Sequence, residues 1–225
     1  MESFRQIVAL LIKDFTAELR TKELFTSMLV FVLLTLVIFN FAFGGARLSL
    51  EVIAGAVWVA FLFAANLGLS RSFVQEVDKG CLEGLLLCPA ERYVIYFGKA
   101  LGNLIFILIV ELLTLPLLPL FFSSTSLLRE PLKLIGVFLL GSAGISFIGT
   151  LFSAMTANLK ARELLLPLLA FPVLTPVLIA SVKLTLYLAN PSPIYEPFRW
   201  LQLLVVYDII FSVLAYLTFE FVVEE

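Results

Sequence analysis

Residues 24–43 read LFTSMLVFVLLTLVIFNFAF, an apolar run that contains no charged side chain. About 20 such residues in a helix cross the hydrocarbon core of a bilayer. The rest of the chain has the same character, because 61% of its 225 residues are hydrophobic and only 14% are charged. Soluble domains contain roughly 45–50% apolar and about 25% charged residues. The sequence therefore predicts an integral membrane protein.

Five further apolar stretches are long enough to cross a membrane. Lipid offers the backbone no hydrogen bonds, so only helices or a closed barrel can span it, and the alternating pattern of barrel strands is absent. We therefore expect an all-α integral membrane fold with six transmembrane helices in a single domain, residues 1–225. The five stretches are Val52–Leu69, Ala100–Phe122, Leu134–Leu159, Leu164–Val182 and Leu201–Phe219.

Residues 1–23, before the first span, have an amphipathic pattern. Apolar side chains recur there at helical spacing while the charged residues fall on the other face. This pattern predicts a helix lying along the cytoplasmic membrane surface, and an ordinary cytoplasmic helix is the alternative. The apolar positions are Phe4, Ile7, Val8, Leu11, Phe15 and Leu19.

The lysines and arginines orient the chain. Ten of the 15 lie before the first span, between the second and third, or between the fourth and fifth. Because basic residues gather on the cytoplasmic side of a membrane, we expect a multi-pass protein with both termini in the cytoplasm. The net charge of −2 gives no indication of a nucleic-acid partner.

The largest expected cytoplasmic segment is Ser70–Lys99. Its pattern predicts two short helices, with Gly80 ending the first and Pro89 in the first turn of the next, which leads into the third span.

Two carboxylic acids, Glu111 and Asp208, lie within predicted spans. A carboxylate in the membrane is costly, so a functional role for Glu111 is the default hypothesis. The alternative is a protonated or internally paired carboxyl that fastens helices together, through Asn103 or Asn66. We expect Asp208, about two turns from the outer end of its span, to serve helix packing.

Two spans have an unusual composition. The fifth contains Pro167, Pro172 and Pro176 and should be irregular, because each proline removes a helix hydrogen bond. The fourth carries a stripe of small residues, which allow helix backbones to approach closely in lipid. We expect this stripe to face protein; its members are Ser142, Ser146, Gly149, Ser153 and Ala157.

Several classes of activity lack the residues they need. The chain has no histidine, the commonest metal ligand and general base. It has no G-x-x-x-x-G-K-[ST] phosphate loop, so a partner must supply ATP hydrolysis. Cys81 and Cys88 are too few for a disulfide framework and do not have zinc-site spacing. We therefore expect a non-catalytic membrane subunit with no metal site and no cofactor bound directly.

One set of residues carries a resemblance to a known family. The run Arg71-Ser72-Phe73, followed by Glu76, Gly80–Glu83, Leu85 and Pro89, resembles the B subunit of the cytochrome c maturation system, the haem exporter permease. The similarity extends to the charged N-terminal helix, to Gly55–Trp58 and to the proline-rich Leu164–Ile179. Ser70 and Cys81 depart from the residues usual in the family.

The resemblance implies an ABC-2-type permease with six spans and an N-terminal interfacial helix. It implies an ATPase A subunit that binds ATP, membrane subunits C and D, and haem handled by the complex for a chaperone outside the cytoplasmic (inner) membrane. A non-transporting scaffold and a stand-alone channel or carrier are the alternatives. The expected ATPase-coupling residues are Arg71, Phe73, Glu76, Gly80, Leu82, Glu83, Leu85 and Pro89.

Overall fold

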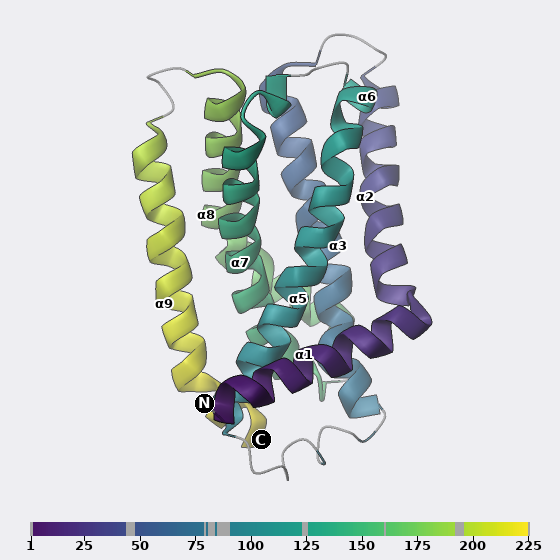
Figure 1. Cartoon of the computed structure of the whole chain (residues 1–225), viewed down its shortest axis with the longest axis vertical. Helices are drawn as coiled ribbons and strands as arrows, with labels where there is room; N and C mark the ends of the chain where they lie inside the picture. The colour runs from purple at the N-terminus through teal and green to yellow at the C-terminus, as the bar shows by residue number, and fades with distance from the viewer. Residues whose placement is uncertain are drawn as a thin grey trace.

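Six long helices form a bundle, and a seventh lies across one end of it. The computed structural model has α1 on the transverse path, and both chain termini lie at the end that α1 covers, called the terminal end below (Figure 1). The model describes residues 2–43, 48–78, 80, 84, 91–122, 126–159, 161–191 and 196–224.

The described residues contain helices and no strand. Six of these helices are long and apolar enough to cross a membrane, which confirms the predicted all-α fold with six transmembrane helices. The third span is built from α5, a short 3₁₀ turn and α6 in succession. The helices are α1 (Glu2–Thr21), α2 (Glu23–Ala42), α3 (Leu50–Asp78), α5 (Arg92–Thr114), η1 (Leu115–Leu117), α6 (Leu118–Phe122), η2 (Ser126–Leu128), α7 (Pro131–Thr156), α8 (Arg162–Ala189) and α9 (Pro197–Glu224).

Helix α3 is longer than the sequence pattern predicted. It continues past Leu69 to Asp78, so the first of the two short helices expected in 70–99 is in fact the end of α3. Twenty-nine residues rise about 43 Å, more than the roughly 30 Å of hydrocarbon, and no glycine or proline interrupts 70–78. Gly80 has a left-handed φ of 63°, and its N–H bonds the Val77 carbonyl at 3.0 Å.

Helix α8 corrects a second expectation. It runs from Arg162 to Ala189 without interruption and includes all three prolines, so the irregular fifth span predicted from them is wrong. Pro172 and Pro176 are exposed and Pro167 is half-buried. Their rings therefore avoid the crowded interface with α7, and packing of the opposite face holds the helix together.

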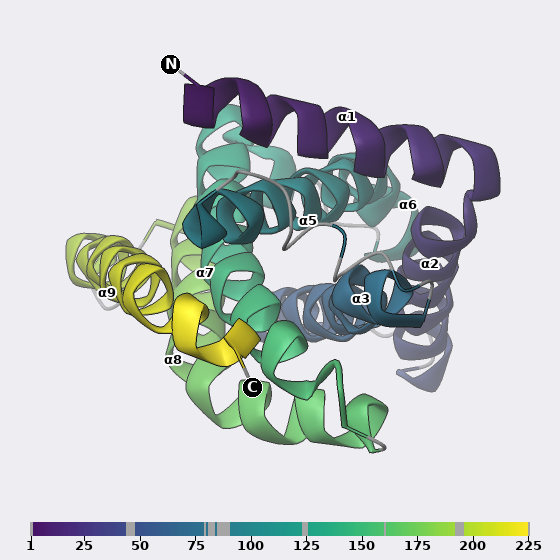
Figure 2. The same ribbon diagram turned by 90° about the horizontal axis from the view of Figure 1, so that it is seen from below.

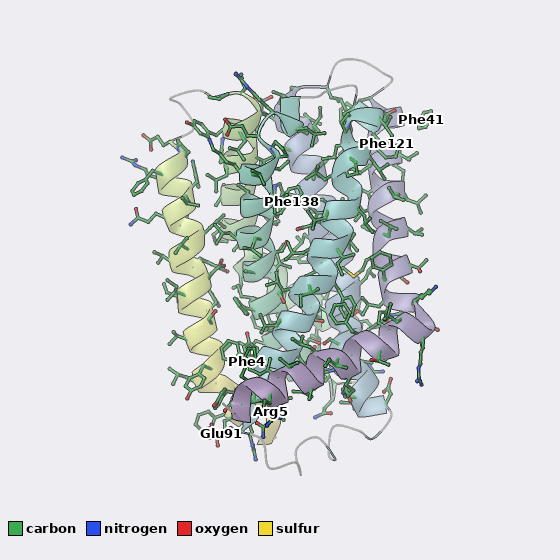
Figure 3. The ribbon with its side chains drawn as sticks, viewed as in Figure 1. Phe4, Arg5, Phe41, Glu91, Phe121 and Phe138 are labelled. Atoms are coloured by element: carbon green, nitrogen blue, oxygen red, sulfur yellow. The ribbon has the colours of Figure 1, made fainter. Side chains whose placement is uncertain are left out.

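Aromatic side chains fill the centre of the bundle. Trp58 of α3 packs edge-on against Phe138 of α7, with ring centroids 5.7 Å apart, and Phe138 lies in the middle of the bundle (Figure 3). The Trp58 Nε1–H donates to Thr185 Oγ1 of α8 at 2.9 Å. These contacts join α3, α7 and α8, while α2 and α9 lie at the periphery.

The small-residue face of α7 is buried against α3 and α5. Ser146 Oγ donates to the Ala100 carbonyl and Ser153 Oγ to the Leu69 carbonyl, both at 2.6 Å. A Cβ added to Gly149 would lie 2.3 Å from Leu69 Cδ1. Backbone approach and inter-helix hydrogen bonds therefore occur along one face, as expected for packing in lipid.

We predict that Gly149→Leu destabilises the chain by about 1–3 kcal/mol, the usual range for overpacking a core. Leu69 is buried and has no free space to move into. Gly136→Leu in the same helix is the matched control, because nothing lies within 4 Å of a Cβ added there. Thermal unfolding in detergent measures the difference, and equal midpoints for the two variants would contradict the packing argument.

Candidate functional site

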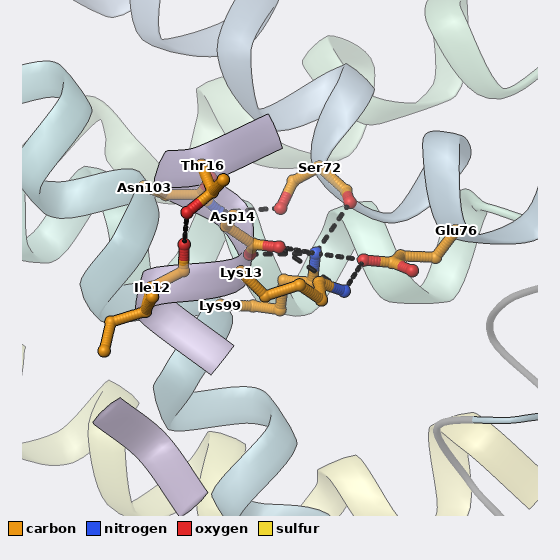
Figure 4. A network of polar contacts seen from close by, with 8 residues as sticks. All are labelled: Ile12, Lys13, Asp14, Thr16, Ser72, Glu76, Lys99 and Asn103. Carbon is orange, nitrogen blue, oxygen red and sulfur yellow. Dashed lines mark hydrogen bonds and ion pairs between the residues drawn. The ribbon is translucent and has the colours of Figure 1, made fainter. Parts of the chain in front are cut away.

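A cluster of charged and polar side chains joins four helices at the terminal end (Figure 4). It is called the charge cluster below. Its members are Lys13 and Asp14 of α1, Ser72 and Glu76 of α3, Lys99 and Asn103 of α5, and Thr150 of α7.

Lys99 is the centre of the charge cluster. Its residue is only 4% exposed, and its Nζ lies 3.0 Å from Asp14 Oδ2 and 2.7 Å from Glu76 Oε1. The third donor direction is used by the Ser72 carbonyl at 3.4 Å. An ammonium group has three donors, so this buried cation is fully paired, as burial requires.

Lys13 balances the charge at the edge of the cluster. Its Nζ donates to Glu76 Oε1 and lies 3.5 Å from Asp14 Oδ1. Burial alone would lower the pKa of Lys13, but the hydrogen bond to Glu76 and the negative charges of Asp14 and Glu76 outweigh burial and raise the pKa. Two ammonium groups therefore face two carboxylates, and the cluster is neutral as a whole.

Asn103 extends the network to α7. Its Nδ2 donates to Ser72 Oγ at 3.2 Å and to Thr150 Oγ1 at 2.9 Å. The pairing of Asn103 with Glu111, considered from the sequence, is therefore wrong: the amide reaches toward the terminal end of α5, away from Glu111.

Glycines bring α1 close to α5. A Cβ added to Gly98 would lie 2.9 Å from Leu10 Cδ1, and one added to Gly102 would lie 3.5 Å from Leu11 Cδ2. Phe15 stacks on Phe106 with centroids 4.6 Å apart. Glycines four residues apart allow close helix approach, and this approach brings Asp14 within reach of Lys99.

The expected coupling residues have different environments. Phe73 is buried, in contact with Phe219, and Glu76 belongs to the charge cluster, so both are internal to the chain. Arg71 is exposed, with Nη1 3.7 Å from Glu23 Oε2, and Gly80 follows the end of α3. Leu82, Glu83, Leu85 and Pro89 lie outside the described residues.

A second ionic contact ties α8 to α3. The Arg162 guanidinium forms two parallel hydrogen bonds to the Asp78 carboxylate, each 3.0 Å long. A hollow of about 600 Å³ opens beside Arg162, between the ends of α7 and α8. The last residue of α3 is therefore fixed to the first residue of α8.

The two intramembrane carboxyls lie apart from the charge cluster. Glu111 is fully buried and accepts a hydrogen bond from Ser142 Oγ at 2.6 Å. Asp208 is buried, and its Oδ1 would lie 2.8 Å from a Cβ added to Gly144 of α7. Among the residues described, Glu111 Oε2 and both Asp208 oxygens have no hydrogen-bond partner. Both groups thus face other helices.

Sequence reasoning missed Lys13, Asp14 and Lys99. The available signal was the spacing of four between Ser72 and Glu76 and between Lys99 and Asn103, which puts each pair on one helix face. Pairing α1 with these faces requires the fold.

Comparison with known proteins gives consistent matches over most of the chain. A family profile described as CcmB protein matches residues 5–221. Heme exporter protein B of Rhodobacter capsulatus is 32% identical over 179 residues, 78% of this chain and 80% of that protein. Its counterpart in Pseudomonas aeruginosa is 33% identical over 156 residues, 67% of each chain, and that of Paracoccus denitrificans is 30% identical over 181 residues, 78% of this chain and 80% of its own.

We predict that Lys99→Met destabilises the chain by about 3–5 kcal/mol, because it leaves buried carboxylates short of a partner. Lys13→Met, at a half-exposed position, should change stability by less than about 1 kcal/mol. Adding Glu76→Gln to Lys99→Met should recover part of the loss by removing one unpaired charge. Unfolding in detergent tests this, and additive effects of the two substitutions would contradict the proposed ion pair.

Proposed function

The chain belongs to the CcmB protein family, and from this we propose that it is the membrane permease subunit of an ABC-type complex that exports haem for c-type cytochrome maturation. The observation that carries the proposal is the match to CcmB along nearly the whole chain, together with six membrane-spanning helices. The curated relatives are named heme exporter protein B. The resemblance noted from the coupling residues is thereby confirmed.

We further propose how ATP hydrolysis in a separate A subunit is coupled to this chain. The ATPase binds the segment between α3 and α5 at the terminal end, which we assign to the cytoplasm from the distribution of lysines and arginines. Gly80 is the first described residue after α3, and the expected contact residues 82–89 follow it. Movement of this segment is applied directly to the ends of α3 and α5.

The charge cluster and the Arg162–Asp78 pair support this coupling. Lys99 and Glu76 link α5 to α3, Asp14 adds α1, and Arg162 adds α8. Helix ends that are tied by buried, fully paired groups move together more readily than ends in contact only through lipid. In this proposal Phe73 and Glu76 transmit force inside the chain, and do not contact the ATPase.

Haem is carried by the partner membrane subunits C and D in this proposal. The chain has no histidine, the usual strong axial ligand for a transported haem. Of the two methionines within spans, Met28 is buried with Sδ against Gly68, and Met155 lies half-exposed on α7. The role of this chain is then to transmit mechanical work to the subunits that deliver haem to the chaperone on the outer side.

We expect Gly80→Val to leave the chain inserted in the membrane but to release or uncouple the ATPase. The left-handed φ at Gly80 strains a β-branched residue, whereas Gly80→Asn, the control, tolerates it. Co-purification of the ATPase and the cellular content of c-type cytochromes measure the effect. Glu83→Lys, at the expected contact surface, should act like Gly80→Val.

Normal ATPase binding and normal cytochrome c content in both Gly80→Val and Glu83→Lys would contradict the coupling role. A non-transporting scaffold makes a different prediction: the assembled complex should tolerate a break in the charge cluster. Lys99→Met, tested in complexes that still assemble, therefore separates the two functions, because only coupling requires the cluster to transmit movement.

We predict that the purified chain alone shows no stoichiometric low-spin haem with two axial ligands. The physical reason is the lack of histidine in the sequence. Absorption spectra after addition of haem, with the complete complex as the positive control, make the measurement. Sharp low-spin bands from the single subunit would show that this chain holds haem itself.

A further inference from the structure

Helix α1 carries balanced charges in the sequence but an unbalanced set on its outer surface. Asp14 is directed inward to Lys99 at 3.0 Å, and Glu18 Oε1 accepts a hydrogen bond from the Phe25 backbone N–H at 2.9 Å. Arg5 and Arg20 are exposed, and neither lies within ion-pair distance of a carboxylate among the described residues. The fold therefore uses these acidic groups internally and leaves the arginines outside.

The same helix exposes an apolar stripe. Phe4, Ile12 and Leu19 are 71%, 61% and 70% exposed, and at about 100° per residue they lie within one third of the helix circumference. The side of α1 that packs on the bundle uses other residues, among them Leu10 and Leu11. No described part of the chain covers the stripe.

The position of α1 suits a membrane surface. It runs across the terminal end, beside α5 and at a large angle to the spans (Figures 1 and 2). Phe4 lies on the side of α1 toward the spans and Arg5 on the side away from them (Figure 3). A helix at the bilayer boundary needs this order, with apolar side chains toward the acyl chains and cations at the headgroups.

We propose that the outer face of α1, formed by Phe4, Arg5, Ile12, Leu19 and Arg20, binds the anionic phospholipid headgroups of the membrane leaflet at the terminal end. The apolar stripe enters the boundary between headgroups and acyl chains, and the two arginines contact lipid phosphates. Lys22, exposed in a left-handed turn between α1 and α2, adds a third cation. This inference concerns lipid binding and is independent of how the ATPase is coupled.

Charge favours lipid over a protein partner on this face. An acidic protein would pair with the arginines but would leave the adjacent apolar stripe in water or in lipid. An anionic leaflet satisfies both sets of side chains at once, since its surface attracts each cation while its interior accepts the stripe.

The test uses the full chain in nanodiscs of phosphatidylcholine, with or without an equal amount of phosphatidylglycerol. Hydrogen exchange of the α1 amides is followed by mass spectrometry. Phosphatidylglycerol should slow exchange of the wild-type helix, by roughly fivefold for each arginine at the anionic surface. The double variant Arg5→Gln/Arg20→Gln should lose most of this slowing, whereas Arg129→Gln, a cation at the opposite end of the bundle, should keep it.

A second substitution tests the apolar stripe. Ile12→Ser should speed exchange of α1 in phosphatidylcholine alone, because the contribution of the stripe does not depend on headgroup charge. Three outcomes would overturn the proposal. They are exchange that ignores phosphatidylglycerol in the wild type, a phosphatidylglycerol effect that survives in the double arginine variant, and protection of the outer face that arises only when partner subunits are added.

Discussion

In lipid, a helix gains little by hiding apolar side chains from its surroundings, because the surroundings are apolar as well. Helices must then be held by close backbone approach and by polar groups that find partners inside the protein. Helix α7 meets this constraint with serines and glycines directed at the neighbouring helices. Ser146 and Ser153 bond carbonyls of α5 and α3, and Gly149 admits Leu69. The arrangement of α3, α5 and α8 depends on this one face.

The same constraint explains the composition of the charge cluster. A buried ammonium is tolerated only when its donors are used, and Lys99 uses all three. Its partners come from α1 and α3, so the cost of burying one lysine is met only if three helices dock together. Such a group specifies one arrangement of the helix ends, because removing any partner leaves a charge unpaired. A chain that responds to an ATPase at this end benefits from ends that move as one body.

The polar groups are sorted along the bundle. Paired charges gather at the terminal end, and Glu111 and Asp208, within spans, face serine and glycine positions of α7. The exposed surface of the spans is apolar, with large side chains on α2, α8 and α9. Helix α1 is the exception, since it exposes apolar and cationic side chains together. That combination separates its outer surface from the lipid-facing sides of the spans.

The sequence alone determined the fold class, because six apolar stretches of sufficient length can only be helices in lipid, and the residues from Arg71 to Pro89 were sufficient to indicate the family. It could not determine where α3 ends, since residues 70–78 are polar enough for a loop yet contain no helix breaker. It also predicted a broken fifth span, whereas packing on α7 keeps α8 continuous through three prolines. The charge cluster was decided by tertiary structure alone. Asp14, Glu76 and Lys99 are far apart in the sequence, and only the approach of α1 to Gly98 and Gly102 brings these charges within hydrogen-bonding distance.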